Sequence, residues 1–434
     1  MARSLKKSNE QFKRAIKSMP LGVTSNFRYW GEDETIYIKR GKGGRVWDID
    51  DNQYIDYRLG YGPAILGYAD ERVDAAVREG MEIGGVFALA TEMEALVAER
   101  IIKMVPAAEL VRYCVSGTEA VMAALRTARG YTGKDSYIMV EGGYHGMFDS
   151  VMWYLEIEED GEPEVVPTGK GIPQHLKALL NMVPMNDANK LEDLLKAKGD
   201  QIGAFLIEPI LGNAGGITAN AQYVKDAREL CTRHEVIMIV DEVKTGFRVA
   251  RGGVQEWMGV EADLCTYAKA VANGYPISVL AGKEEIMRTI GNGVTHGGTY
   301  TAHSVSICAA NKTLEILDET DALANIEAYG LKMQAGMTKI LNARSIEHVF
   351  VGHASMGGLF FTEEQPTDYR DWKKTDNTLY EALAEEMLEH GVMIEPDSRE
   401  PFFLCESHDE ACLKETLEGF ELGLDGALKK LGRS

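Results

Sequence analysis

The amino-acid sequence predicts an α/β protein whose central sheet is mostly parallel, with a smaller α+β domain built from both chain ends. Three observations support this fold class. Wholly apolar short runs alternate with amphipathic helical stretches through the middle of the chain, the two ends follow other patterns, and 434 residues suit two closely packed domains. Strands that are apolar on both faces belong to a sheet that helices cover on each side.

The N-terminal segment begins with a basic amphipathic helix. After a loop, a strand–turn–strand pattern runs from Thr35 to Tyr57. In the middle of the chain, five apolar runs each predict a buried strand. They are Leu110–Val115, Tyr137–Val140, Ile202–Ile207, Val236–Val240 and Leu264–Tyr267. Helices are expected between these strands, including Glu119–Thr132, which Gly133 ends, and Tyr223–His234.

From about residue 311 the chain is rich in helical patterns, with short strands expected in GGLFFT and EPFFLC. No Pro/Gly/Ser-rich linker separates independent domains. We therefore expect residues 51–310 to form a large domain. Residues 1–50 and 311–434 are expected to form a small domain that contains both chain ends.

Composition excludes several classes of function. With 46 Lys and Arg against 67 Asp and Glu, the net charge of −21 opposes binding to nucleic acid or an anionic membrane. The basic N-terminus is followed by no apolar stretch and no apolar run is long enough to span a bilayer, so a cytoplasmic protein is expected. The six cysteines are scattered without a CxxC pair, and no metal site or disulfide framework is predicted.

Three different chemical groups follow the ends of predicted strands, where ligands bind in open α/β sheets. Gly117 and Thr118 lead into a helix, whose free N–H groups suit a phosphate, although an ordinary helix cap explains them too. Asp241 is a carboxylate at the mouth of a buried strand, with a cap or a structural ion pair as the alternative. Lys269 lies between two alanines, where a neutral amine is favoured; a lysine that reaches solvent is the alternative.

Together these groups match the phosphate, the ring nitrogen and the aldehyde of pyridoxal 5′-phosphate. The carboxylate would keep the ring nitrogen protonated, and the amine would hold the aldehyde as a Schiff base. An aromatic residue is expected against the ring. Tyr144 in EGGYHG is the candidate, because it follows the strand that ends at Val140.

With these residues in place, the chain resembles the class III pyridoxal-phosphate aminotransferases of fold type I, most closely their glutamate-1-semialdehyde aminomutase-like branch. The resemblance covers nearly the whole chain. The segments that carry it are, in order, LGVTSNFRYW, WDIDDNQYIDYRLGYGPAILGYAD, VSGTEAVMAALRTARGYTG, EGGYHG, IEPILGN, IVDEVKTGFR, AKAVANGYP and GGTYTA. Their shared order and spacing are far more specific than any one of them.

The resemblance implies a role for each matched residue. Lys269 would form the Schiff base and carry the proton between substrate and cofactor, and Asp241 would pair with the pyridine nitrogen. The other implied cofactor contacts are Val243 and Tyr144 on opposite ring faces, His145 beside Tyr144, Gly117 and Thr118 at the phosphate, Glu208 and Asn213 near the ring oxygen and substrate, and Thr299 at the phosphate of a neighbouring subunit. A homodimer with shared active sites is therefore implied.

Substrate contacts are also expected. Arg28 in SNFRYW falls where this branch places an arginine that grips a substrate carboxylate, and Arg399 in PDSREPFF is a second candidate. A surface salt bridge is the alternative for each. Tyr61 is expected to form an aromatic wall, to which Tyr29, Trp30 and Tyr154 could add. Such a wall favours an aromatic or extended apolar substrate, although aromatic residues more often belong to a core.

The chain departs from the branch in three places. The stretch after the lysine, AVANGYP, is poor in glycine, and TAHS replaces the expected Ser-Gly-Asn-Pro after Thr299-Tyr300. The aminomutases carry a small Ser/Gly-rich gating loop after the YHG motif, whereas this chain has the bulky acidic segment from Tyr154 to Glu164. That segment argues against mutase activity and leaves transamination unaffected.

The sequence thus predicts an aminotransferase that moves an amino group from an amino acid, including β-amino acids, or from an amine to a 2-oxo acid in a ping-pong reaction. An aminomutase, a racemase or a decarboxylase on the same cofactor is the alternative within enzymes. A non-catalytic α/β ligand-binding protein that keeps the motifs as structure is the alternative outside them.

Overall fold

A computed structural model describes residues 3–157 and 163–433 of the chain. Its centre is a seven-stranded sheet with the order β4-β14-β13-β12-β9-β5-β8, in which β14 alone runs antiparallel to its neighbours. The strands are β4 (Leu110–Cys114), β14 (Ser278–Gly282), β13 (Leu264–Tyr267), β12 (Ile237–Asp241), β9 (Ile202–Ile207), β5 (Ser136–Val140) and β8 (Leu180–Val183). The predicted α/β class with a mostly parallel sheet is confirmed, and β8 and β14 are additions to it.

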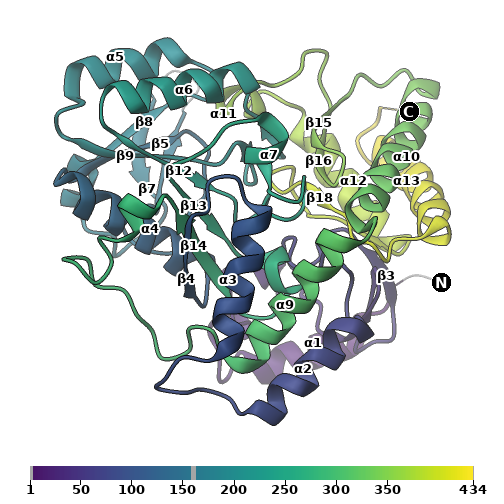
Figure 1. Cartoon of the computed structure of the whole chain (residues 1–434). Helices are drawn as coiled ribbons and strands as arrows, with labels where there is room; N and C mark the ends of the chain where they lie inside the picture. Colours follow the sequence, from purple (N-terminus) through teal and green to yellow (C-terminus); the bar gives the residue numbers. More distant parts are fainter. Residues whose placement is uncertain (1–2, 158–162, 434) are drawn as a thin grey trace.

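Helices cover both faces of this sheet, as continuous apolar strands require. Successive residues of β5 alternate between two cores: Tyr137 and Met139 belong to the cluster that contains α4 (Gly117–Thr132), and Ile138 and Val140 belong to the other. The second cluster includes apolar residues of α5 (Ala188–Lys198) and α6 (Ala221–Arg233), which lie together at the outer side of the sheet (Figure 1). Both faces are therefore desolvated, and the strand ends are the open places.

The remaining helices near the sheet pack mainly around its β4 side. They are α2 (Glu71–Ile83), α3 (Glu92–Met104), α8 (Glu284–Met287) and α9 (Ser304–Glu319), and Figure 1 shows α2, α3 and α9 together. The short helix α7 (Val254–Met258) follows β12 in the chain. A separate antiparallel ribbon joins β6 (Trp153–Glu156) to β7 (Glu164–Pro167). The predicted acidic loop spans this ribbon, and its residues 158–162 lie outside the described residues. Within the described ranges, no helix is long and apolar enough to cross a membrane.

A second region combines residues from both ends of the chain (Figure 1). Its first sheet has the order β1-β2-β3-β17, and β17 pairs in parallel with β3, with Val392 opposite Ile55. Its second sheet has the order β15-β16-β18. The elements of this region are α1 (Lys6–Ala15), β1 (Ile38–Lys42), β2 (Arg45–Asp48), β3 (Gln53–Asp56), α10 (Ala322–Ala343), β15 (Val349–His353), β16 (Met356–Phe360), α11 (Tyr369–Trp372), α12 (Asn377–Glu389), β17 (Val392–Met393), β18 (Phe402–Phe403) and α13 (Glu410–Lys430).

The predicted domain boundaries both fall inside continuous units of this structure. A boundary at residue 50 separates β3 from the sheet in which it pairs with β2, and a boundary at residue 310 cuts α9. We therefore propose that the small domain consists of residues 1–57 and 320–434. In the sequence, the hairpin pattern alone does not show that a third strand joins the same sheet.

Arg248 connects the turn after β12 to the C-terminal region. Its side chain is fully buried, and the guanidinium donates hydrogen bonds to the carbonyl oxygens of Gly62 (2.6 Å), Leu404 (2.7 Å) and Ser355 (3.2 Å). Burial lowers the pKa of Arg248 to about 10, but the group remains charged at neutral pH. The cation thus joins the loop before α2 to two C-terminal segments.

We predict that Arg248→Met lowers the free energy of unfolding by about 3 kcal/mol, because three buried carbonyl oxygens lose their donor. Arg251→Met is the matched control: Arg251 is half-exposed and pairs with Asp318 at 3.0 Å, so its loss should cost less than about 1 kcal/mol. Urea-unfolding midpoints of the two variants test this difference. Equal midpoints would show that Arg248 does not hold the regions together.

Candidate active site

The carboxyl ends of five strands meet at one edge of the central sheet, because β4, β5, β9, β12 and β13 all run in the same direction. A cavity of about 230 Å³ lies at this edge. Its lining residues are Phe27, Gly60, Tyr61, Gly117, Thr118, Val121, Tyr144, His145, Gly146, Glu208, Asn213, Asp241, Val243, Lys244, Lys269 and Glu400. The three strand-end groups that the sequence singled out therefore share one cavity.

Lys269 begins the short 3₁₀ turn that follows β13, and its backbone is left-handed with φ = 49°. Its Nζ donates a hydrogen bond to the carbonyl oxygen of Tyr61 at 2.8 Å. Burial, reinforced by the nearby ammonium of Lys244, lowers the pKa of Lys269 to about 7. A large share of this amine is therefore neutral and nucleophilic near neutral pH, as the strand-end position predicted.

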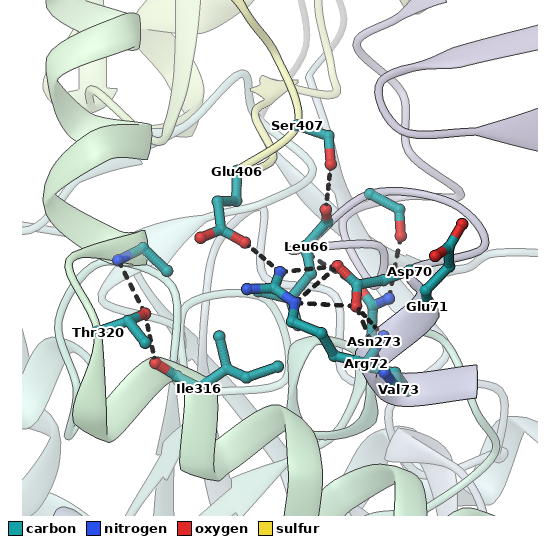
Figure 2. A network of polar contacts seen from close by, with 12 residues as sticks. Leu66, Asp70, Glu71, Arg72, Val73, Asn273, Ile316, Thr320, Glu406 and Ser407 are labelled. Atoms are coloured by element: carbon teal, nitrogen blue, oxygen red, sulfur yellow. Dashed lines mark hydrogen bonds and ion pairs between the residues drawn. The ribbon is translucent and has the colours of Figure 1, made fainter. Parts of the chain in front are cut away.

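The turn that carries Lys269 is bound to the loop that carries Tyr61. Asn273, at the end of the turn, accepts a hydrogen bond from the Leu66 N–H (2.9 Å) and donates one to the Gly67 carbonyl (3.0 Å). Ser407 in turn donates to the Leu66 carbonyl at 2.6 Å. Figure 2 shows this network, together with Arg72 placed between Asp70 and Glu406. The same contacts therefore hold both the turn that carries Lys269 and the loop that carries its hydrogen-bond acceptor, the Tyr61 carbonyl.

Asp241 ends β12 with a buried carboxylate that accepts hydrogen bonds on both oxygens. Oδ2 lies 2.8 Å from Nδ1 of His145, and Oδ1 accepts from the hydroxyl of Thr266 (3.1 Å) and the N–H of Val243 (3.0 Å). These contacts fix the orientation of the carboxylate at the strand mouth. In the described part of the chain, the buried Nε2 of His145 has no hydrogen-bond partner.

Glu208 directly follows β9 and places a second buried carboxylate in the cavity. Its Oε1 accepts a hydrogen bond from the backbone N–H of Tyr144 at 2.7 Å, which ties the aromatic residue to this strand end. Burial, together with the charge of Asp241, raises the pKa of Glu208 to about 7, against the opposing effects of His145 and Lys244. The group is therefore only partly ionised near neutral pH.

The start of α4 forms a narrow cradle. Ser116 caps the helix by accepting from the Glu119 N–H at 3.3 Å, so the predicted cap is present, and the first N–H groups of a helix have no acceptor within it. A methyl group on Gly117 would lie 3.0 Å from Val243, and one on Gly146 would lie 2.6 Å from the hydroxyl oxygen of Thr118. The two glycines therefore keep the helix start open to a ligand that carries negative charge.

Aromatic rings form one side of the cavity. The ring of Phe27 lies 6.2 Å from that of Tyr61 and 6.4 Å from that of Tyr144, with both pairs near edge-to-face. Of the other aromatic residues suggested from the sequence, Tyr29 packs against Phe12, Trp30 lines a neighbouring cavity, and Tyr154 donates a hydrogen bond to Glu156.

Three predicted residues lie outside this cavity. Arg28 is exposed and lines the neighbouring cavity of about 580 Å³, which shares Gly60 and Tyr61 with the first. Arg399 pairs with Asp397 at 2.7 Å, the surface ion pair considered as its alternative. Thr299 is exposed and lines a third hollow at the surface. The roles expected of these three residues stay predictions.

Sequence reasoning missed six residues that line the cavity, Gly60, Val121 and Gly146 among them. Each of the other three adjoins a residue that it named. Phe27 precedes Arg28, Lys244 follows Val243, and Glu400 follows Arg399. Lys244 and Glu400 form an ion pair at 2.7 Å across the cavity wall. The signal for Lys244 was a second lysine close to Asp241, three residues further along in the segment IVDEVKTGFR.

The polar groups that line the cavity match those that pyridoxal 5′-phosphate needs. It combines the glycine-lined helix start, the oriented carboxylate of Asp241 and the partly neutral amine of Lys269, which suit the phosphate, the ring nitrogen and the aldehyde of that group. In the parts of the chain that the structure covers, no cluster of His, Cys, Asp and Glu is arranged to hold a metal ion.

Comparisons with known proteins support this chemistry. Residues 29–409 match the family model described as aminotransferase class-III. The chain is 38% identical over 423 residues to a glutamate-1-semialdehyde 2,1-aminomutase of Methanothermobacter thermautotrophicus, covering 97% of this chain and 99% of that protein. Among solved structures, an omega-transaminase from Sphaerobacter thermophilus superposes with a TM-score of 0.90 at 27% identity, covering 96% of this chain and 97% of the other. A transaminase with PLP bound gives 0.89 at 26% identity and covers 100% of both chains.

We predict that the Lys269 amine of the cofactor-free protein titrates near pH 7. Because burial lowers its pKa, the amine gains a proton in the folded chain only as the pH falls through about 7, whereas an ordinary lysine does so near 10.4. Acetic anhydride labelling at a series of pH values, read by peptide mass spectrometry, should show half-maximal reactivity of Lys269 near pH 7. A reactivity that still rises between pH 9 and 10 would contradict the burial argument.

Proposed function

This chain belongs to the class III aminotransferase family, and on that premise we propose that it transfers an amino group from an amino acid or amine to a 2-oxo acid. It is a pyridoxal-phosphate-dependent enzyme. The observation that supports the proposal most is the meeting of Lys269, Asp241 and the Gly117–Thr118 helix start in one cavity. A non-catalytic binding protein would have no need of a lysine whose pKa is brought near neutrality.

The cofactor, when bound, supplies an aldehyde that condenses with amines and a ring that accepts the electrons left when a proton is removed from the substrate carbon. Binding, orientation and proton transfer are assigned to residues of the protein. Lys269 would hold the aldehyde through its amine, and the same amine, once free, would serve as the base that takes a proton from the substrate carbon and gives it back. Its lowered pKa suits this work, since a base acts best when its pKa is near the working pH.

The other lining residues hold and orient the cofactor in this proposal. Asp241, oriented by His145 and Thr266, would keep the ring nitrogen protonated, and Val243 and Tyr144, which line the same cavity, would contact the ring. Gly117 and Thr118 are assigned to the phosphate. Glu208 and Asn213 are assigned to the ring oxygen and the substrate.

The amino donor is proposed to enter beside the aromatic wall. Tyr61 separates the catalytic cavity from the neighbouring one, in which Arg28 can hold a substrate carboxylate. Phe27 and Tyr61 favour an apolar or aromatic group next to that carboxylate. Arg399 remains a second candidate for a carboxylate, provided that it leaves Asp397.

A homodimer with shared sites is proposed from the surface near Thr299. This residue lies with Leu89 in a surface hollow, outside the catalytic cavity of its own chain. Several large apolar side chains on the surface are more than half exposed, among them Leu89 (82%), Met81 (63%) and Tyr300 (62%). A second copy of the chain would cover them, and Thr299 would then complete the phosphate contacts of the partner.

An aminomutase is the second candidate, because the relative with 38% identity over nearly its whole length carries that name. The acidic segment from Tyr154 to Glu164 is the feature that argues for transamination instead. Its described flanks form the β6–β7 ribbon, in which the side chains of Trp153 and Leu155 are buried. A paired ribbon anchored by two buried side chains is a poor base for a small flexible lid.

The decisive experiment separates the two reactions by their need for an acceptor. We predict that an amino donor panel gives turnover only when pyruvate or 2-oxoglutarate is added, because transamination must discharge the amino group. Lys269→Ala should lower this turnover by about 10³-fold or more while the protein still binds the cofactor. Isomerisation of glutamate 1-semialdehyde without any acceptor would establish the mutase instead, and full turnover by Lys269→Ala would overturn both.

We further predict that two defective variants complement each other if active sites are shared. Mixing Lys269→Ala chains with Thr299→Ala chains produces mixed dimers in which one site has an intact Lys269 and an intact Thr299 from the other chain. Such a mixture should be more active than the mean of its two parents, and Leu89→Glu should shift wild-type protein toward monomer in sedimentation. Leu422→Glu, at a 54% exposed position on α13, is the control for the added charge. A fully active monomer would exclude the shared site.

A further inference from the structure

Lys244 lines the catalytic cavity, and the proposed function gives it no role. It lies on the turn that follows β12, three residues after Asp241, and only 5% of its side chain is exposed. Its Nζ donates to the carbonyl oxygen of Gly212 (2.7 Å), to Oδ1 of Asn213 (2.9 Å) and to Oε2 of Glu400 (2.7 Å). An ammonium has three N–H donors, so this arrangement employs all of them.

The hydrogen bond from Lys244 to Asn213 determines which way the side-chain amide of Asn213 faces. A side-chain amide has one acceptor oxygen and one donor NH₂ group, and only the oxygen can face an ammonium. The NH₂ group of Asn213 therefore points away from Lys244. Because Asn213 also lines the cavity, this group is available there as a hydrogen-bond donor.

The contact with Glu400 neutralises a carboxylate that is itself mostly buried. The side chain of Glu400 is 13% exposed, and one of its two oxygens is held by Lys244. Removing the lysine alone would leave that charge without a partner in the cavity wall, which is strongly unfavourable. Lys244 thus joins the loop after β10 (Ile210–Leu211) to the C-terminal segment through one cation.

Gly212 leaves the space that the side chain of Lys244 occupies. A methyl group on Gly212 would lie 2.1 Å from Cδ of Lys244 and 2.8 Å from its Nζ. The φ of Gly212 is not in the left-handed region, so the backbone does not require glycine there. The close approach of the Lys244 side chain is therefore the reason for a residue without a side chain at this position.

We propose that Lys244 is a positioning residue, whose ammonium turns the Asn213 NH₂ group toward the ring oxygen of the cofactor and holds Glu400 in the cavity wall. This inference rests on the proposed function. The same ammonium also contributes, after burial, to the lowered pKa of Lys269.

The test measures the dissociation constant for pyridoxal phosphate by equilibrium dialysis. We expect Lys244→Met to weaken binding by about tenfold, because the Asn213 donor is no longer oriented. Gly212→Ala should weaken binding in the same direction, since it displaces the lysine without removing it. In an Asn213→Ala background, Lys244→Met should cause little further loss. The matched control is Lys283→Met, because Lys283 pairs with Asp263 at 3.3 Å outside the cavity and its removal should leave binding unchanged.

A second measurement separates positioning from simple stability. Lys244→Met/Glu400→Gln removes both charges, so the urea midpoint should return toward that of the wild type while the tenfold loss of cofactor affinity persists. If affinity recovers together with the midpoint, Lys244 is only structural and the proposal is overturned. Wild-type affinity in both Lys244→Met and Gly212→Ala overturns it as well. Failure of the wild-type protein to take up the cofactor would instead contradict the proposed function itself.

Discussion

Burial of the Lys269 amine at the end of β13 is the constraint on which the rest of the cavity depends. A buried cation is costly, and the molecule reduces the cost by lowering the pKa of the amine to about 7 and by offering it the carbonyl of Tyr61. That carbonyl must be held in place. The contacts of Asn273 and Ser407 with the loop residues Leu66 and Gly67 restrain the segment from which Tyr61 projects.

The electrostatic balance of the cavity is local and independent of the overall net charge of −21. Asp241, Glu208 and Glu400 place three carboxylates near two lysines, Lys244 and Lys269, in the lining of one cavity. Paired groups in such a site interact strongly, and each shifts the protonation of the others. Burial is the main cause of both the raised pKa of Glu208 and the lowered pKa of Lys269. Lys244 opposes the shift of Glu208 and reinforces that of Lys269, whereas the carboxylates oppose the shift of Lys269.

Backbone strain is also present around the cavity. Leu59 (φ = 43°), Tyr61 (φ = 71°) and Lys269 (φ = 49°) all adopt left-handed conformations, which side-chain-bearing residues rarely do. Such conformations persist only where surrounding contacts over-determine them. Arg248 supplies part of that restraint through the carbonyl of Gly62, the residue after Tyr61, so a buried cation far along the chain holds the strained turn.

The sequence by itself determined the five parallel strands of the central sheet and the residues that follow them, because hydrophobic periodicity and strand-end position are local properties. It also identified Thr118, Asp241 and Lys269, since parallel strands must bring their carboxyl ends to one edge. The pairing of Lys244 with Glu400 in the cavity wall and the pairing of β3 with β17 were decided only by tertiary structure. Each of these depends on contacts between segments distant in the chain, and neither charge nor periodicity along a sequence specifies which distant group lies within hydrogen-bonding reach.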